Sequence, residues 1–221
     1  VSGFPVIWQT AFPEAEIFPD QDTLEVTPNS CDLVIHATAL HWANDLVGQL
    51  IQCRRALQPD GLFLAACFGG QTLIELRAAL AEAEIEITGG LSPRIAPMAE
   101  IRDLGGLLQR AGFALPVADS ARLTVTYRSA RHLMHELRAM GENNALANRL
   151  RHPTKAAVLR RTEEIYNARH RRDDGTIAAT FEMIYLTGWA PDPSQPKPLR
   201  PGSAVTRLSA ALKTQENPLK D

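Results

Sequence analysis

The chain has 221 residues, of which 45% are hydrophobic and 22% are charged, so it can bury a core without disulfide or metal support. Its 23 Lys and Arg residues nearly balance 25 Asp and Glu residues, and the net charge of −2 predicts no binding of nucleic acid. No apolar run is long enough for a transmembrane segment. The three cysteines, which form no C-x-x-C pair, predict buried thiols in a reducing, cytoplasmic compartment.

Helix and strand patterns alternate from the beginning of the chain, which predicts an α/β fold. A short apolar strand is expected at 32–36, and a helix capped by Asn44 follows it and ends near Leu57. A turn at 58–61 then leads into a fully apolar strand at 62–68. This strand–helix–strand order predicts two parallel strands with a right-handed crossover.

The next segments continue the alternation. Thr72 and Glu75 have the spacing of a capping box at the start of a helix. A further helix is expected over 98–111, followed by two strands, at 114–117 and 123–127.

The second half of the chain changes in character. Residues 129–172 have only helical patterns, which predicts an insertion or lid, and a buried strand follows at 180–189. The proline-rich sequence beyond it predicts an extended tail with a short helix near 204–212. The expected organisation is therefore a core, a helical insertion, a final core strand and a tail, at 1–128, 129–172, 173–190 and 191–221.

The common nucleotide and metal motifs are missing from the sequence. None of the 14 glycines stands in a G-x-G or P-loop spacing, and no histidine begins an H-x-[DE] pair. His132 and His135 are one helical turn apart, which fits either a zinc pair or two surface histidines. No metal site and no catalytic residue is assigned from these patterns.

The strand ends are the best places to seek a ligand site, because ligands bind beyond the carboxyl ends of parallel strands. His36 ends the strand expected at 32–36, and His41 and Trp42 follow it; these residues are either ligand contacts or packing and capping residues. Asp20, Gln21 and Asp22 follow residues 15–18, which could form another strand, and acids there can accept hydrogen bonds from ribose hydroxyls or an exocyclic amine. Acids are also common in loops, so this observation alone leaves both interpretations open.

The order of these segments resembles the class I S-adenosylmethionine-dependent methyltransferases of type 11. The closest likeness is to the mitochondrial complex I assembly factors that carry a methyltransferase fold, and to their bacterial relatives. The segments that carry this likeness are DLVIHATALHWANDL (32–46), LQPDGLFLAACFGGQTLIELR (57–77), GGLSPRIAPM (89–98), DLGGLLQRAGF (103–113), MGENNAL (140–146) and TGWAP (187–191).

The resemblance implies a Rossmann-like sheet, mostly parallel, with strand order 3-2-1-4-5-7-6 and an antiparallel strand at 180–189. It also implies S-adenosylmethionine as cofactor. By position in the family, the cofactor-binding residues would be Asp20 and Gln21 at the adenine end and His36, Ala37 and Thr38 at the methionine end. The substrate-side residues would be His41, Trp42, Ser92 and Arg94.

Members of this family hold the cofactor with a glycine-rich turn after the first strand, and this chain has no such turn. We expect that segment to precede residue 1; the alternative is a degenerate relative. The implied function is methyl transfer to an unidentified acceptor. The alternative is an assembly factor for a complex I-type enzyme, acting as a protein arginine hydroxylase or as a non-catalytic module. In that case the partner would be a protein substrate or a respiratory-complex subunit, bound through the locally basic stretch 129–172 or, if that stretch is only a solvated helix face, elsewhere.

Overall fold

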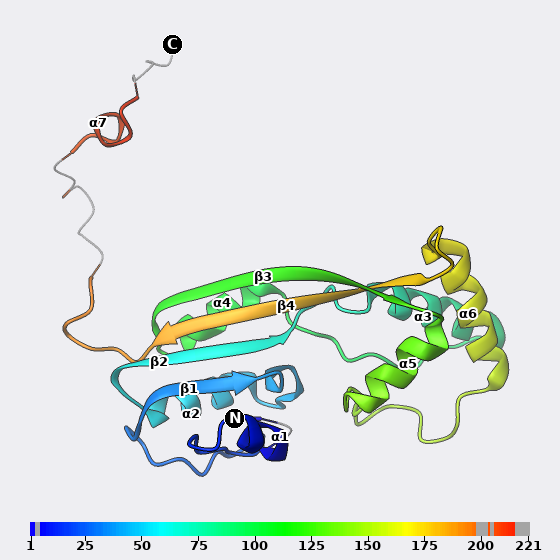
Figure 1. The fold of residues 1–221 in the computed structure, drawn as a ribbon, viewed down its shortest axis with the longest axis horizontal. Helices are drawn as coiled ribbons and strands as arrows, with labels where there is room; N and C mark the ends of the chain where they lie inside the picture. The colour runs from blue at the N-terminus through cyan, green and yellow to red at the C-terminus, as the bar shows by residue number, and fades with distance from the viewer. Residues whose placement is uncertain (3–4, 198–202, 204–205, 215–221) are drawn as a thin grey trace. The chain divides into compact units, whose positions relative to one another are not determined.

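The computed structural model describes residues 1–2, 5–197, 203 and 206–214, and it divides into two units, Val1–Pro191 and Asp192–Asp221. The first unit holds the sheet and the helices that cover it (Figure 1). Its strands are β1 (Cys31–Ala37), β2 (Leu57–Phe68), β3 (Ala114–Tyr127) and β4 (Ile177–Trp189). Its helices are α1 (Pro5–Ala11), the short 3-10 helix η1 (Leu40–Trp42), α2 (Leu46–Ala56), α3 (Ile74–Thr88), α4 (Ile101–Arg110), α5 (Ala130–Ala139) and α6 (Ala156–His170).

The four strands form one sheet in the order β1-β2-β4-β3. β1 and β2 are parallel, whereas β4 is antiparallel to both of its neighbours. The expected βαβ unit and the expected antiparallel strand are therefore confirmed. The observed order equals the last four positions of the order that the family resemblance implied.

Helices α2 and α4 cover one face of this sheet (Figure 1). Leu50 of α2 and Leu108 of α4 are fully buried, and the ring of Phe63 on β2 stacks on Phe113 at a centroid distance of 4.8 Å. Residues on the opposite face are only half covered: Leu33, Ile35, Val117 and Tyr185 are between 45% and 55% exposed. The hydrophobic core of the described residues thus lies mainly on one side of β1 and β2.

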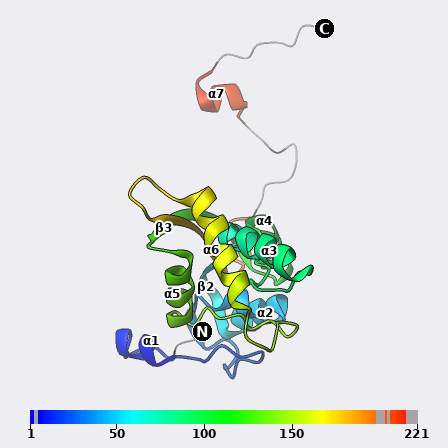
Figure 2. The same cartoon turned by 90° about the vertical axis from the view of Figure 1, so that its right-hand side faces the viewer.

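A second core lies beyond the carboxyl ends of β1 and β2, where α3, α5 and α6 pack around the far ends of β3 and β4 (Figure 2). Tyr166 of α6 is fully buried, and its hydroxyl donates to the carbonyl of Ala178 on β4 at 2.8 Å. On α6, Arg161 forms an ion pair with Glu86 of α3, and Arg169 forms one with Glu82 of the same helix. These pairs neutralise part of the locally basic sequence, although exposed pairs of this kind stabilise a fold little.

Two of the expected helix caps are wrong. Helix α2 is capped by Asp45, whose Oδ1 accepts from the Gly48 amide at 2.9 Å, and Asn44 instead donates to Asp22. Thr72 and Glu75 form no capping box, because both side chains form hydrogen bonds with the distant strand β4. The Thr72 hydroxyl donates to the Glu182 carbonyl, and Glu75 accepts from the Thr180 amide. Thr72 and Glu75 therefore form hydrogen bonds to residues far away in the sequence in place of the local capping bonds.

Several element boundaries also differ. The two strands expected at 114–117 and 123–127 are one continuous strand, β3, because β4 pairs along its whole length. β2 begins at Leu57, so the expected turn at 58–61 lies within an irregular part of that strand. Residues 15–18 form no strand. Helix α4 begins at Ile101 and not at 98, and α1 was not expected at all.

The second unit contains α7 (Leu208–Leu212), which agrees with a short helix in the tail. Residues 204–205 of that expected helix, like 198–202 and 215–221 of the tail, lie outside the described residues. All three cysteines are free thiols; Cys53 and Cys67 are buried and Cys31 is partly exposed. None of the described helices combines the length and the apolarity that crossing a membrane requires.

Candidate functional site

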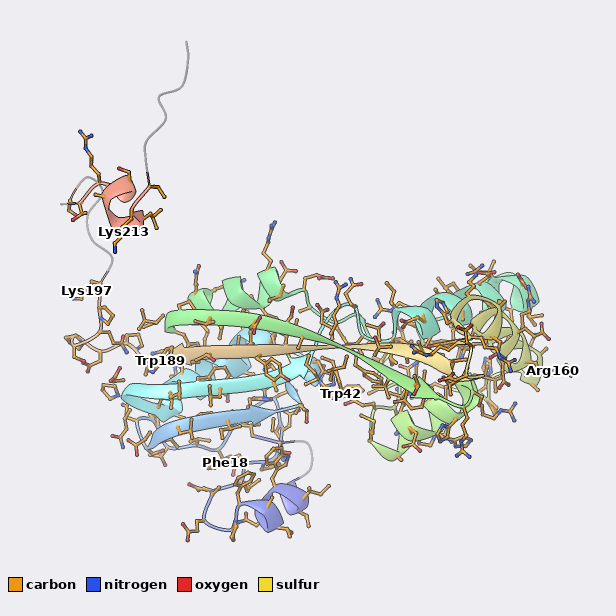
Figure 3. The ribbon with its side chains drawn as sticks, turned by 45° about the horizontal axis from the view of Figure 1, so that its top comes forward. Phe18, Trp42, Arg160, Trp189, Lys197 and Lys213 are labelled. Carbon is orange, nitrogen blue, oxygen red and sulfur yellow. The ribbon has the colours of Figure 1, made fainter. Side chains whose placement is uncertain are left out.

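The carboxyl ends of β1 and β2 point toward the cluster of α3, α5 and α6 (Figure 1). His36 and Ala37 end β1, and Thr38 follows with a left-handed φ of 49° and donates its amide to the Ala66 carbonyl of β2. Trp42 lies between the sheet and the helical cluster, whereas Trp189 lies at the opposite end of the sheet (Figure 3). The strand ends therefore open onto the space beside Trp42.

His36 is a buried imidazole at this strand end. It has no exposed surface, and neither of its ring nitrogens has a hydrogen-bond partner among the described residues. The nearest acid is Asp20, whose Oδ1 lies 3.8 Å from Nε2. Burial is the main cause that lowers the pKa of His36 to about 3, so the ring is neutral at physiological pH.

Asp20 is brought to His36 by Gln49 of α2. The Gln49 side-chain amide donates to Asp20 Oδ1 at 2.7 Å and to the Gln21 carbonyl at 3.3 Å. Burial raises the pKa of Asp20, and the hydrogen bond from Gln49 partly opposes this rise. The structure thus brings together Asp20, Gln21 and His36, three of the residues assigned to the cofactor; the assignment itself stays a prediction.

A cavity of about 770 Å³, here called the main cavity, lies between the strand ends and the helical cluster. His41 and Trp42 line it from η1, and Arg94 lines it from the loop before α4. Most of its wall is apolar: Phe68, Leu73, Leu76, Leu80, Ile95, Met98, Met134, Leu137, Leu159 and Phe181. A concave, mainly apolar space with a few polar groups is the usual form of a small-molecule site.

His41 is a buried polar group of this wall, with a side chain only 3% exposed. Its Nε2 lies 3.2 Å from both carboxylate oxygens of Glu142, and its ring packs edge-on against Phe68. The other nitrogen, Nδ1, is buried without a partner among the described residues. Glu142 was not expected in the site; the signal that could have found it is the MGENNAL segment, which carried the resemblance but received no role.

Ser92 and Arg94 serve chiefly to hold Glu84 of α3. The Ser92 amide donates to Glu84 Oε2 at 3.0 Å, and Arg94 donates to both carboxylate oxygens and, through Nη1, to Thr154 Oγ1 at 2.8 Å. Burial opposes ionisation of Glu84, but the bonds from Arg94 and Ser92 outweigh it and lower the pKa of this carboxyl. Arg94 borders the main cavity, whereas Ser92 is not part of its lining.

The histidines of α5 are arranged differently. His132 Nε2 lies 3.5 Å from Glu136 on the same helix, and His135 is an exposed side chain beside the main cavity. In the part of the chain that the structure describes, no three His, Cys, Asp or Glu side chains are placed together to hold a metal ion.

A second cavity of about 460 Å³ lies along the outer edge of β1. Its wall is formed by Leu33 and Ile35 of β1, by Trp8 and Phe12 of the N-terminal segment, and by Cys53 of α2. Ser2 forms an isolated parallel bridge with Ala37 at this edge. The apolar edge of β1 is thus only partly covered by the described residues.

The sheet is Rossmann-like with one reversed strand, and it has a cavity at the carboxyl ends of its parallel strands; in α/β proteins of this class that is the usual place for a ligand. Comparison with known proteins is more specific. A family model described as "Methyltransferase domain" matches residues 12–65. Among solved structures, the YcgJ protein of Bacillus subtilis aligns with a TM-score of 0.49 at 13% identity, over 85% of this chain and 76% of that chain, which is too weak a likeness to support a conclusion.

Three curated relatives are much closer in sequence. The chain is 41% identical to "Arginine-hydroxylase NDUFAF5, mitochondrial" of Dictyostelium discoideum, over 86% of this chain and 44% of the relative. The human protein of the same name is 40% identical, over 89% of this chain and 57% of the relative. A "Malonyl-[acyl-carrier protein] O-methyltransferase" of Gallionella capsiferriformans is 33% identical, over 93% of this chain and 68% of the relative.

The chain belongs to the class I S-adenosylmethionine-dependent methyltransferase family. It spans about half the length of the NDUFAF5 relatives that it matches. The family resemblance drawn from the sequence segments is thereby confirmed.

Proposed function

We propose that this protein binds S-adenosylmethionine beyond the carboxyl end of β1 and transfers its methyl group to an acceptor held in the main cavity. The observation that carries this proposal is the position of the main cavity. It begins at His41 and Trp42, only a few residues after the end of β1, where the family places its cofactor.

The residues at the end of β1 fit a polar cofactor. His36 has two buried ring nitrogens that no described residue satisfies, and a buried polar group of this kind normally has a partner. The Asp20 carboxylate beside it can accept hydrogen bonds from the hydroxyl or amino groups of an adenosine. We therefore assign Asp20 and Gln21 to the adenosine end, and His36, Ala37 and Thr38 to the methionine end.

When bound, S-adenosylmethionine supplies a methyl group on a positively charged sulfur, so the protein has mainly to bind, orient and exclude water. Phe68, Leu73 and Phe181 provide an apolar wall for the acceptor. His41 and Trp42 lie at the end of this wall nearest β1. We also propose that residues 129–172, with α5 and α6, are an insertion that forms the outer wall of the main cavity.

A second function is supported by the two relatives named as arginine hydroxylases, which are about 40% identical to this chain. In that alternative the protein acts on, or simply binds, a protein substrate or a respiratory-complex subunit. The relatives carry the word "mitochondrial" in their names, whereas the three free thiols of this chain are consistent with the cytoplasm, where we propose that it acts.

Calorimetric titration of S-adenosylmethionine into the full-length protein tests the proposal. We expect saturable binding, and Asp20→Ala should weaken it by about tenfold, which corresponds to the loss of one charge-assisted hydrogen bond. Absence of heat and of a thermal shift would refute cofactor binding. An unchanged affinity of Asp20→Ala would show that the adenosine end is placed wrongly.

The two functions differ in their products. A protein or small-molecule acceptor incubated with the full-length protein gains one methylene unit by mass if a methyl group is transferred. It gains one oxygen atom if it is hydroxylated. Mass spectrometry of the modified acceptor therefore separates the transferase from the hydroxylase.

A further inference from the structure

Helix α5 presents a row of basic side chains to the main cavity. Arg131, His135 and Arg138 all line it, and because they are four and three residues apart they lie on one side of the helix. All three are exposed, whereas Met134 and Leu137, which line the cavity from the same helix, are half-buried and buried. The cavity is therefore apolar inside and basic at the rim that α5 forms.

The two arginines of this row have no acidic partner. Among the described residues, no carboxylate forms an ion pair with Arg131 or Arg138. Glu136, the acid of α5, pairs with a histidine of the same helix, and two residues before Arg138 it faces another side. By contrast, Arg161 and Arg169 of α6 pair with acids of α3. Two permanently ionised guanidinium groups thus remain available at the rim.

The other charged groups beside the cavity are already paired. Of the described residues that line it, Glu142 is the one acid, and it lies 3.2 Å from His41. Arg94 also lines the cavity, but its guanidinium donates to both carboxylate oxygens of Glu84. The lining therefore carries a net positive charge, and the unpaired part of this charge lies on α5.

We propose that the acceptor is an amphipathic anion, whose apolar body lies along Phe68, Leu76 and Phe181 and whose anionic end group binds Arg131 and Arg138. This inference rests on the proposed methyl transfer and names the substrate class of that reaction. The end group, a carboxylate or a phosphate, serves as a handle for binding. The atom that receives the methyl group is a different part of the molecule.

The size and the chemistry of the cavity fit such a molecule. Its volume of about 770 Å³ is that of a small-molecule site, and an apolar chain is stabilised when it leaves water for an apolar wall. The end group stays hydrated, because both arginines are exposed, and a guanidinium can bind a carboxylate or a phosphate through two parallel hydrogen bonds. Arg131 and Arg138 are about 10 Å apart along the helix, so their long side chains can converge on one group.

Calorimetric titration of the full-length protein with probes that share one alkyl chain tests this inference. The probes are octanoate, octyl phosphate, 1-octanol and octylguanidinium. At least one of the two anions should bind about fivefold more tightly than 1-octanol, or better, because it gains two exposed ion pairs. The tighter anion identifies the end group. A smaller preference for both anions, or no binding of any probe, would overturn the inference. Tighter binding of octylguanidinium would also overturn it and would favour a cationic acceptor.

Substitutions on α5 show whether the anions bind at the proposed place. The double variant Arg131→Gln/Arg138→Gln should lower the anion affinity to that of 1-octanol and leave 1-octanol binding unchanged, which shows that the fold is intact. Each single substitution should produce part of this loss. The matched control is Arg160→Gln, since Arg160 is an exposed arginine of α6 that does not line the cavity. An anion affinity that survives in the single and double variants would refute the role of α5.

Calorimetry with S-adenosylmethionine on the same samples separates the two proposals. The double variant should bind the cofactor as the unmodified protein does, because none of the residues assigned to the cofactor lies on α5. Cofactor binding without a preference for anions refutes only the acceptor class. Anion binding without cofactor binding refutes methyl transfer itself.

Discussion

Arg94 forms a bidentate ion pair with Glu84: its Nε donates to Oε2 at 3.1 Å and its Nη2 donates to Oε1 at 2.7 Å. The Glu84 side chain is only 3% exposed, and that of Arg94 is 17% exposed. Because Arg94 also donates to Thr154, this pair ties the loop before α4 both to α3 and to the segment that begins α6.

Removing the arginine should leave a buried carboxylate without its main partner. We expect Arg94→Ala to lower the free energy of unfolding by about 3 kcal/mol, as is usual when one member of a buried ion pair is removed. Urea denaturation measures this loss. Arg169→Ala is the control, because it removes only an exposed pair with Glu82 and should change stability by less than about 1 kcal/mol. Equal losses in both variants would contradict the structural role of Arg94.

The buried ring of His36 should make the protein sensitive to mild acid. Its pKa falls from 6.5 to about 3 on folding, so above pH 6.5 both states are neutral and the residue adds no pH dependence. Below pH 6.5, His36 takes up a proton in the unfolded chain but stays neutral in the folded protein. The free energy of unfolding should then fall by about 1.4 kcal/mol per pH unit until the folded pKa is reached.

Replacing His36 by leucine should remove this slope. Unfolding by urea at several pH values between 7 and 4 measures it, with His152→Asn, an exposed histidine, as the control. A slope that persists unchanged in His36→Leu would show that other groups cause the acid sensitivity.

Gly69 is confined by β4. A Cβ at this position would lie 2.7 Å from Glu182 Oε2 and 2.7 Å from Ile184 Cδ1, closer than real Cβ atoms approach. Gly69→Ala should therefore destabilise the fold by about 1–3 kcal/mol, as overpacking does. Gly90→Ala is the matched control, since nothing lies within 4 Å of its Cβ. Thermal unfolding compares the two, and similar melting temperatures would count against this packing.

The cap of α2 offers a simple local test. Asp45→Ala removes the acceptor for the Gly48 amide and should cost about 1 kcal/mol of stability. Asn44→Ala, which removes an exposed hydrogen bond to Asp22, should cost less. If Asn44→Ala were the more harmful change in urea unfolding, the cap would be at Asn44 after all.

The order of elements could be read from the sequence because the signals are local. The apolar strand at 62–68, the helix before it and the proline-rich tail each follow from spacing and composition. The caps could not be read in this way: Thr72 and Glu75 have ideal spacing, yet Thr72 bonds to Glu182 and Glu75 to Thr180. A local sequence pattern shows only that a capping hydrogen bond is possible. A partner more than a hundred residues away can take its place once the chain has folded.

The same division applies to the site. By itself the sequence determined the family, the parallel β1–β2 unit and the set of residues at the end of β1, since these depend on segments that are continuous in the chain. Only the tertiary structure decided three contacts of the site. Arg94 forms an ion pair with Glu84, and Glu142 lies within hydrogen-bond distance of His41. Gln49 donates to Asp20 and so holds it beside His36. Each of these contacts forms because burial makes an unpaired polar group costly, and the partner that satisfies it is chosen by packing, which spacing along the chain does not encode.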